Sequence, residues 1–333
     1  MNSSRISVAK MSRLLNWLGP FLILFFVTGL FAALLASRDA EGLKAFFSLP
    51  NFKTVLTQTV IVAIGSLGMT MIIVSGGIDL SVGSVIALTS VLGAVLLKEQ
   101  CSSATTILLC IAGGGIVGTL NGLLIAGFRI APFIITLGML GVARGVAKWL
   151  AQNQTVNSPR IADSTVAALM QDPDLLGLKP PPGVILVVVL ALLTALVMRK
   201  TVFGRHIFAL GSNEATARLC GIRTRLLKIT IYAVAGLFVG LAGVMQLARL
   251  RQGDPTAAIG LELDIIAAVV IGGASLSGGT GSILGSMIGA LTMAVLRTGS
   301  QYMDWPNYMQ EIIIGILIIL AVGLDRFRQS RQV

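Results

Sequence analysis

The sequence predicts an all-α polytopic membrane protein with about ten transmembrane helices, glycine-interrupted segments and an internal repeat. Of its 333 residues, 55% are hydrophobic and only 12% are charged, a composition that soluble domains do not have. The apolar residues form long runs, and one helix needs about twenty such residues to cross the hydrocarbon core. Two of the runs contain the same glycine-rich pattern. We therefore expect a single transmembrane domain over residues 1–333.

The first expected helix follows a polar tail, residues 1–17, and is an apolar run from Leu18 to Ala36. The run is longer than the core of a usual signal peptide, and no A-x-A cleavage pattern follows it. We expect it to cross the membrane with the tail in the cytoplasm. Trp17 would then lie at the inner interface, where aromatic residues are enriched.

The second and third expected helices share the apolar run from Val55 to Leu97, whose only charged residue is Asp79. The motif SGGIDLSVGS, residues 75–84, interrupts this run. Glycine permits a sharp turn, but backbone groups freed within lipid need hydrogen-bonding partners. Two interpretations remain open, because local polar side chains could cap a tight turn or could line a pathway for a polar substrate. These side chains are Ser75, Asp79, Ser81 and Ser84.

The fourth helix is expected from Thr105 to Gly127 and the fifth from Pro132 to Trp149. Small residues spaced three or four apart let helices approach closely, so the glycines of the fourth helix indicate packing. Asn121 is the polar exception and can either bond to a neighbouring helix or face a substrate. Together with Thr136 it marks an alternative course for a pathway.

An outer loop is expected over residues 151–182, because prolines and the acids Asp163, Asp172 and Asp174 are typical of a surface segment. It could carry one short helix, and it could receive an external partner or only connect its neighbours. The sixth helix, Val184 to Met198, returns the chain to the cytoplasm.

A large cytoplasmic loop is expected over residues 199–228, which contain seven Lys or Arg residues and one acid, Glu214. Positive charge of this kind marks the inner side of a membrane protein. Inside the loop, Ser212 or Asn213 can cap a short helix that Gly221 ends. A short helix capped at both ends offers a rigid contact to another protein.

The seventh helix is expected from Ile229 to Leu247, and the apolar stretch after it, Ile265 to Leu296, has about thirty-two residues where two full spans need about forty. One of its two helices must therefore be broken, tilted or re-entrant. Just before this stretch, Glu262 and Asp264 are two residues apart and diverge on a helix.

The glycine motif returns as IGGASLSGGTGSILG, residues 271–285, which aligns with the first copy once Gly278 and Gly279 are treated as an insertion. Paired glycine-interrupted segments in two halves of a chain indicate a transport site. With ten full spans the two copies fall on the same side, whereas one re-entrant segment would permit an inverted repeat. The polar side chains of the second copy are Ser275, Ser277 and Ser282.

The last helix is expected from Ile312 to Leu324, after an outer belt of Tyr302, Trp305 and Tyr308. Arginines follow it, so both termini are expected to be cytoplasmic. The net charge of +11 is accounted for by inner loops and tails, and nucleic acid is not expected as a partner.

The sequence lacks the motifs of common catalytic and nucleotide-binding sites, so catalysis is disfavoured. There is no G-x-x-x-x-G-K-[ST] loop that could bind ATP. The sequence has a single histidine, and the spacing of its three cysteines is not that of a metal site. Neither a metal nor a cofactor is expected on this chain. Two transport classes remain open, a permease driven by a separate ATPase and an ion-gradient-driven secondary transporter of a small polar solute. The second class tends to place several ionisable groups in the membrane, which Asp79 alone does not provide. An intramembrane enzyme is a weaker third class.

Four segments resemble the permease subunits of bacterial ABC sugar importers, in the ribose-type branch that also includes xylose, arabinose and galactose permeases. They are residues 75–84, PFIITLGM at 132–139, GSNEATARLCGI at 211–222 and ELDIIAAVVIGGASLSGGTGS at 262–282. The resemblance implies translocation of a monosaccharide across the bacterial inner membrane. It also implies a second permease copy or close paralogue, a periplasmic sugar-binding protein and a cytoplasmic ATP-binding subunit that uses the ATP. It assigns contact with that subunit to Asn213, Glu214, Ala215, Ala217, Arg218 and Gly221.

Overall fold

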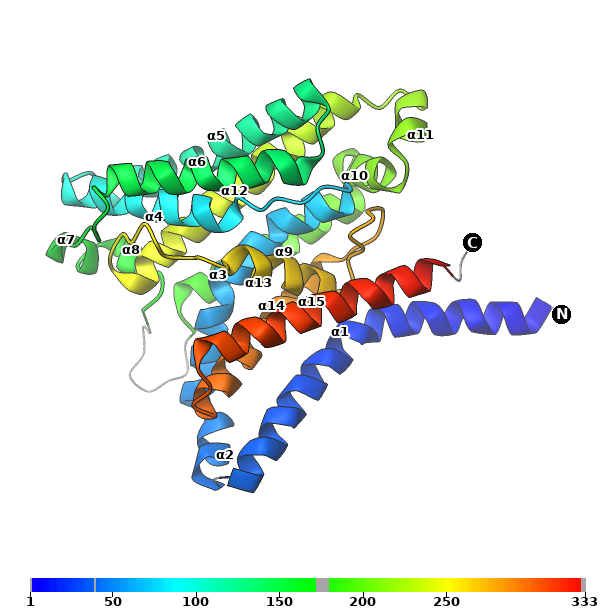
Figure 1. Cartoon of the computed structure of the whole chain (residues 1–333), viewed down its shortest axis with the longest axis horizontal. Coiled ribbons are helices and arrows are strands. Elements are labelled where there is room, and N and C mark those ends of the chain that lie inside the picture. Colours follow the sequence, from blue (N-terminus) through cyan, green and yellow to red (C-terminus); the bar gives the residue numbers. More distant parts are fainter. Residues whose placement is uncertain (1, 39, 172–179, 331–333) are drawn as a thin grey trace.

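The computed structural model describes residues 2–38, 40–171 and 180–330, which are almost entirely helical (Figure 1). Within these ranges the only strand-like pairing is one backbone bridge between Val156 and Gly253. The helices in chain order are α1 (Asn2–Arg38), α2 (Ala40–Phe46), α3 (Leu49–Val74), α4 (Val82–Lys98), α5 (Ser103–Phe128), α6 (Pro132–Leu150), α7 (Pro159–Ala162), α8 (Thr165–Ala168), α9 (Pro182–Lys200), α10 (Val202–Ser212), α11 (Glu214–Leu219), α12 (Thr224–Leu250), α13 (Leu261–Ile271), α14 (Ile283–Tyr302) and α15 (Asn307–Ser330).

Seven of the described helices are long and apolar enough to cross a membrane: α1 from Leu18, α3, α5, α6, α9, α12 and α14. Two further apolar helices are shorter, α4 and the first part of α15. Helix α13 has 11 residues, so it covers about 16 Å, roughly half of the hydrocarbon core. The predicted polytopic all-α architecture is confirmed, and α13 is the shortened helix that the sequence requires after Leu247.

The helix ends follow from local sequence. Ser48 accepts a hydrogen bond from the Asn51 backbone at the start of α3, and Pro50 stands in its first turn. These signals start α3 two turns before the expected Val55. Ser102 caps α5 in the same way, and Arg129 ends it in a left-handed conformation.

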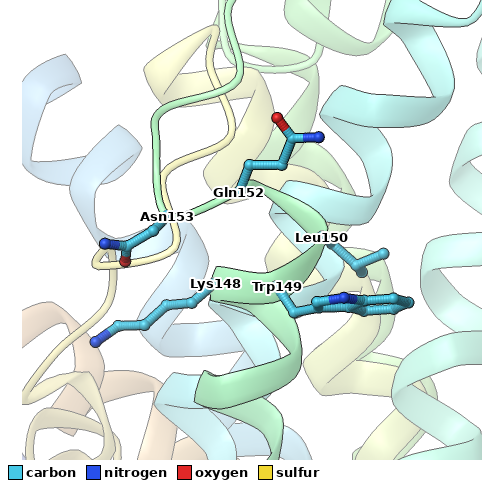
Figure 2. Close-up of a pocket in the computed structure, with 5 residues that line it drawn as sticks. All are labelled: Lys148, Trp149, Leu150, Gln152 and Asn153. Atoms are coloured by element: carbon cyan, nitrogen blue, oxygen red, sulfur yellow. The ribbon is translucent and has the colours of Figure 1, made fainter.

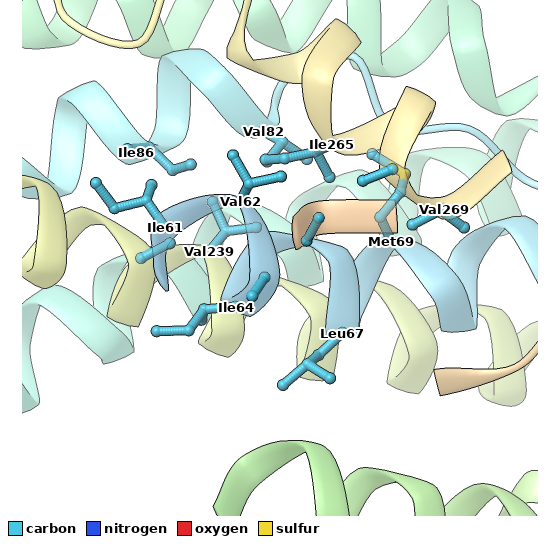
Figure 3. Packing of buried hydrophobic residues seen from close by; sticks show 14 of the residues in the cluster. Ile61, Val62, Ile64, Leu67, Met69, Val82, Ile86, Val239, Ile265 and Val269 are labelled. Carbon is cyan, nitrogen blue, oxygen red and sulfur yellow. The ribbon is translucent and has the colours of Figure 1, made fainter. Parts of the chain in front are cut away.

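Helix α3 lies at the centre of the fold, and 83% of the residues in its most apolar stretch are buried. Figure 3 shows Ile61 of α3 beside Val239 of α12, and Val62 of α3 near Ile265 of α13. In helices α1, α5, α6 and α9, only a minority of the residues in the apolar stretch are buried. Their exposed apolar faces are typical of a chain that is surrounded by lipid or by other membrane subunits.

Close packing of α5 against α12 depends on glycine. A Cβ atom added to Gly114 would lie 2.6 Å from the Cα of Gly240, and one added to Gly118 would lie 2.9 Å from the Cα of Gly236. Real Cβ atoms do not approach backbone atoms this closely. The fourth predicted helix is therefore packed as expected, with small residues at a helix–helix interface.

Two predicted loops differ from the structure. Most of residues 199–228 is helical, because α9 continues to Lys200, α10 follows at once and α12 begins at Thr224. The outer segment contains two short helices, α7 and α8, and its residues 172–179, with Asp172 and Asp174, lie outside the described residues. The start of α1 and the end of α15 lie on the same side of the molecule as α11 (Figure 1).

Candidate functional site

The two copies of the glycine motif lie against each other. Helix α3 ends in the first glycine loop, residues 75–81, and α13 ends in the second glycine loop, residues 272–282. The backbone N–H of Gly279 donates a hydrogen bond of 2.8 Å to the carbonyl oxygen of Val74. Farther along the same two helices, Ile265 packs against Gly65. Helices α3 and α13 therefore run in the same direction, so the repeat is parallel and not inverted.

Both helices end with the same backbone turn. Gly76 and Gly273 have left-handed φ angles of +83° and +89°. In each copy the next residue donates back to the fifth residue before it, Gly77 to Ile72 and Ala274 to Val269. This is the Schellman ending that glycine favours. Gly76 therefore corresponds to Gly273, one position away from the Gly272 given by the sequence alignment.

In the turn after each helix end, the structure again agrees with the sequence alignment, which pairs Asp79 with Ser275 and Ser81 with Ser277. Asp79 Oδ1 accepts a hydrogen bond of 2.8 Å from the backbone N–H of Ser81. In the second copy, Ser275 Oγ accepts one of 3.2 Å from the backbone N–H of Ser277. A side chain that binds the backbone two residues later stabilises a turn in both loops. The repeat therefore holds at the level of hydrogen bonding.

A buried polar network surrounds the first glycine loop. Asp79 Oδ1 also accepts from Ser81 Oγ at 2.6 Å, and Asn121 Nδ2 of α5 donates to Ser81 Oγ at 3.0 Å. Thr136 of α6 receives a hydrogen bond of 3.1 Å from the backbone N–H of Leu80. Asp79, Ser81, Asn121 and Thr136 are all no more than 6% exposed. Asn121 and Thr136 thus belong to the same cluster as the first motif and do not mark a separate course.

Three of the other predicted pathway residues bind helix ends in this conformation. Ser75 Oγ donates to Ile72 at the end of α3, and Ser84 Oγ donates to Ser81 at the start of α4. Ser282 caps α14. These bonds fit the capping interpretation, while the role of the same residues in a pathway stays a prediction.

Glu262 and Asp264 diverge, as the sequence predicts. Asp264 is 2% exposed and pairs with Arg297 of α14. Glu262 points instead to α4, where its carboxylate lies against Gly83. The sequence interpretation did not single out Arg297, although an arginine within an apolar helix is the signal that reveals such a pair.

Helix α11 has the predicted caps. The backbone N–H of Thr216 donates to Asn213 Oδ1 at 2.9 Å, and Gly221 follows the helix with a φ of +82°. Glu214 forms ion pairs with Lys228 of α12 at 2.8 Å and with Arg218 at 3.4 Å.

The exposed face of α11 differs from the predicted set. Ala217 is only 4% exposed and packs against its own chain, so it is not available to a partner. Leu219, which the prediction omitted, is 89% exposed. The exposed residues of α11 and its caps are Asn213, Ala215, Thr216, Arg218, Leu219, Cys220 and Gly221, so Ala217 and the half-buried Glu214 are the predicted residues that are not fully exposed.

A surface hollow of about 580 Å³ lies at the end of α6. Its side chains do not converge, because Lys148 and Asn153 point to one side and Trp149 and Leu150 to the other (Figure 2). Trp149 is 76% exposed, which fits an aromatic residue at a membrane interface. We do not assign a ligand to this hollow.

Comparison with known proteins gives a consistent result. The family model for the permease component of branched-chain amino acid transport systems matches residues 51–322. The ribose import permease protein of Escherichia coli K12 is 38% identical over 284 residues, which are 85% of this chain and 88% of that protein. The ribose import permease protein of Bacillus subtilis 168 is 37% identical over 313 residues, 94% of each chain. The L-arabinose ABC transporter permease protein of Azospirillum brasilense is 36% identical over 275 residues, 81% of this chain and 78% of that protein. No solved structure matches the chain.

Proposed function

Because this chain belongs to the family of branched-chain amino acid transport system permease components, we propose that it carries ribose or a similar monosaccharide as the membrane permease subunit of an ABC sugar importer. One observation carries this proposal. Sequence similarity to the ribose import permease of Bacillus subtilis covers 94% of the chain. The alternative of an ion-gradient-driven secondary transporter has no comparable support.

The chemistry of the glycine loops suits a neutral polyol better than an amino acid. An amino acid carries separate ammonium and carboxylate charges, which a transport site would be expected to match with opposite charges. The loop network offers hydroxyls, amides and backbone groups, with Asp79 as its only ionisable side chain apart from Tyr232. The pathway residues are Ser75, Asp79, Ser81, Ser84, Asn121, Thr136, Ser275, Ser277 and Ser282.

Burial of most of these groups indicates a closed conformation. Ser81, Asn121 and Thr136 are at most 1% exposed. A sugar could reach them only after the first glycine loop separates from α5 and α6, since hydrogen bonds now join Ser81 to Asn121 of α5 and Leu80 to Thr136 of α6. Transport by this route therefore requires a conformational change that an external energy source drives.

Helix α11 is the proposed contact with the ATP-binding subunit, which would bind the ATP in place of this chain. Leu219 supports this role, because a leucine that is 89% exposed beside a basic segment is the type of residue that a partner covers. The side of α11 is then cytoplasmic, with both chain ends on it (Figure 1). A periplasmic sugar-binding protein would approach the opposite side, and a second permease copy or paralogue would complete the channel in the inner membrane.

Reconstituted proteoliposomes test the function. The permease, with its ATP-binding and sugar-binding partners, should take up labelled D-ribose, L-arabinose or D-xylose only when ATP is supplied. Uptake driven by a proton gradient without ATP would overturn the ATPase-driven mechanism. Uptake of leucine without uptake of any of the three sugars would overturn the substrate class.

A further inference from the structure

Gly211 lies where the end of α10 touches both glycine loops. A Cβ atom added to Gly211 would overlap the carbonyl oxygen of Val74, at the end of α3, and would lie 2.7 Å from the backbone N of Gly279. The contact at Gly211 is therefore made with backbone atoms of Val74 and Gly279. At Gly211 itself, the nearest atoms are therefore backbone atoms, which cannot change rotamer to absorb a movement.

The first loop takes part in the same contact. A Cβ atom added to Gly278 would lie 2.7 Å from the carbonyl oxygen of Gly211 and 3.1 Å from the Cα of Gly76. Gly278 and Gly279 both have left-handed φ angles, +87° and +77°. This two-residue insertion bends the second loop toward the first loop and toward α10. The insertion that distinguishes the second copy from the first in sequence thus brings the two copies into contact in space.

Helix α11 begins three residues after Gly211, with Asn213 as its cap. A second connection runs in parallel through α12. Lys228 is paired with Glu214 of α11, and Tyr232, one turn farther along α12, donates a hydrogen bond of 3.4 Å to the Ile78 carbonyl of the first loop. A movement of α11 therefore reaches the first loop by two routes and the second loop through Gly211.

We propose that Gly211 is a positioning residue for transport, through which α10 and α11 move both glycine loops as one unit. This inference rests on the proposed contact between α11 and an ATP-binding subunit. Close-packed backbone contacts move together because they resist compression. The two loops then open and close in step, which sequence similarity alone does not reveal.

Gly211→Ala tests the proposal in proteoliposomes of the complete importer. We expect ATP hydrolysis to persist while the amount of sugar carried per ATP falls at least tenfold, because the methyl group separates α10 from the loops. Gly127→Ala is the matched control, since nothing lies within 4 Å of a Cβ atom at that position, and it should behave as wild type. Gly204→Ala crowds the same helix against the end of α9. A loss of sugar per ATP equal to that of Gly211→Ala would overturn the specific role of Gly211.

A cross-link tests the same contact without adding bulk at Gly211. A Cβ atom at Gly279 would lie 3.4 Å from the Cβ of Ser212, close to the range of roughly 3.5–4.5 Å that disulfides prefer. In a background without Cys101, Cys110 and Cys220, the pair Ser212→Cys and Gly279→Cys should oxidise readily. The oxidised importer should keep the ATP-driven uptake of its reduced form, because the two segments move together. Uptake that stops on oxidation and returns on reduction would overturn the proposal.

Different results contradict the proposed function and the role of Gly211. A wild-type importer that carries none of the three sugars with ATP contradicts the proposed function. A wild-type importer that carries sugar, with Gly211→Ala equally coupled, contradicts the role of Gly211 alone.

Discussion

Removing the Asp79 carboxylate should destabilise the first glycine loop more than any other single change in its network. Asp79 Oδ1 accepts hydrogen bonds from both the backbone N–H and the hydroxyl of Ser81, at 2.8 and 2.6 Å. Asp79→Ala leaves both buried donors without this acceptor. A hydrogen bond to a charged group contributes about 1.5–3 kcal/mol in soluble proteins, and polar bonds within membranes contribute less, about 0.6 kcal/mol on average. We therefore expect a loss of roughly 2–4 kcal/mol for the pair.

Thermal unfolding of the purified permease in detergent measures this loss. For a large single domain, 1 kcal/mol corresponds to roughly 2–4 °C in Tm, so Asp79→Ala should unfold about 4–16 °C below wild type. Asp79→Asn keeps one acceptor oxygen and should lose about 1 kcal/mol. Ser81→Ala keeps the backbone bond and should fall between the two. An Asp79→Ala protein that unfolds within 1 °C of wild type would refute this account of the loop.

The three remaining predictions concern other parts of the chain. Gly118→Ala should separate α5 from α12 and lower Tm by several degrees, whereas Gly138→Ala, with nothing within 4 Å of its added Cβ, should match wild type; equal Tm values would contradict the packing. Leu219→Asp should leave Tm unchanged but weaken copurification of the ATP-binding subunit at least tenfold, and unchanged copurification would remove α11 from that contact. Arg297→Met should cost about 3 kcal/mol because it leaves the buried Asp264 without its partner; restoration of Tm by the double variant with Asp264→Ala would support this cause, and a double variant no more stable than the single one would oppose it.

Local chemistry made the helix ends predictable. Gly76, Pro132 and Asn213 begin or end helices close to the expected positions because their conformational preferences act within a few residues. Helix α10 was not expected, because the basic residues on both sides of it, from Arg199 to Lys228, indicated an inner loop. Its apolar residues Phe203, Ile207 and Leu210 do recur at helical spacing, but this period is only two turns long.

The assembly of the site was beyond the sequence for a different reason. Asn121 and Thr136 are 40 and 56 residues from their partners in the first loop, and no local pattern encodes contacts at that separation. The burial of Ala217 is equally invisible, because one alanine fits either face of a short helix. The shared motif did predict a paired site, and the structure adds that the two copies touch each other.

The shortness of α13 reduces the barrier that a sugar faces. Ile265 packs beside Gly65, sixteen residues from the start of α3 at Leu49, so α13 begins about 18 Å along α3 from that end. The connection before it, residues 251–260, reaches from the bridge between Gly253 and Val156 to this depth, and it leaves Arg251, Thr256 and Ile259 exposed. A sugar arriving from that side would keep its shell of water molecules until then. The low-dielectric layer in which protein hydrogen bonds must replace that water is only about half as thick as the bilayer core. The first glycine loop crosses this layer, from the end of α3 beside Gly279 to the start of α4 beside Glu262.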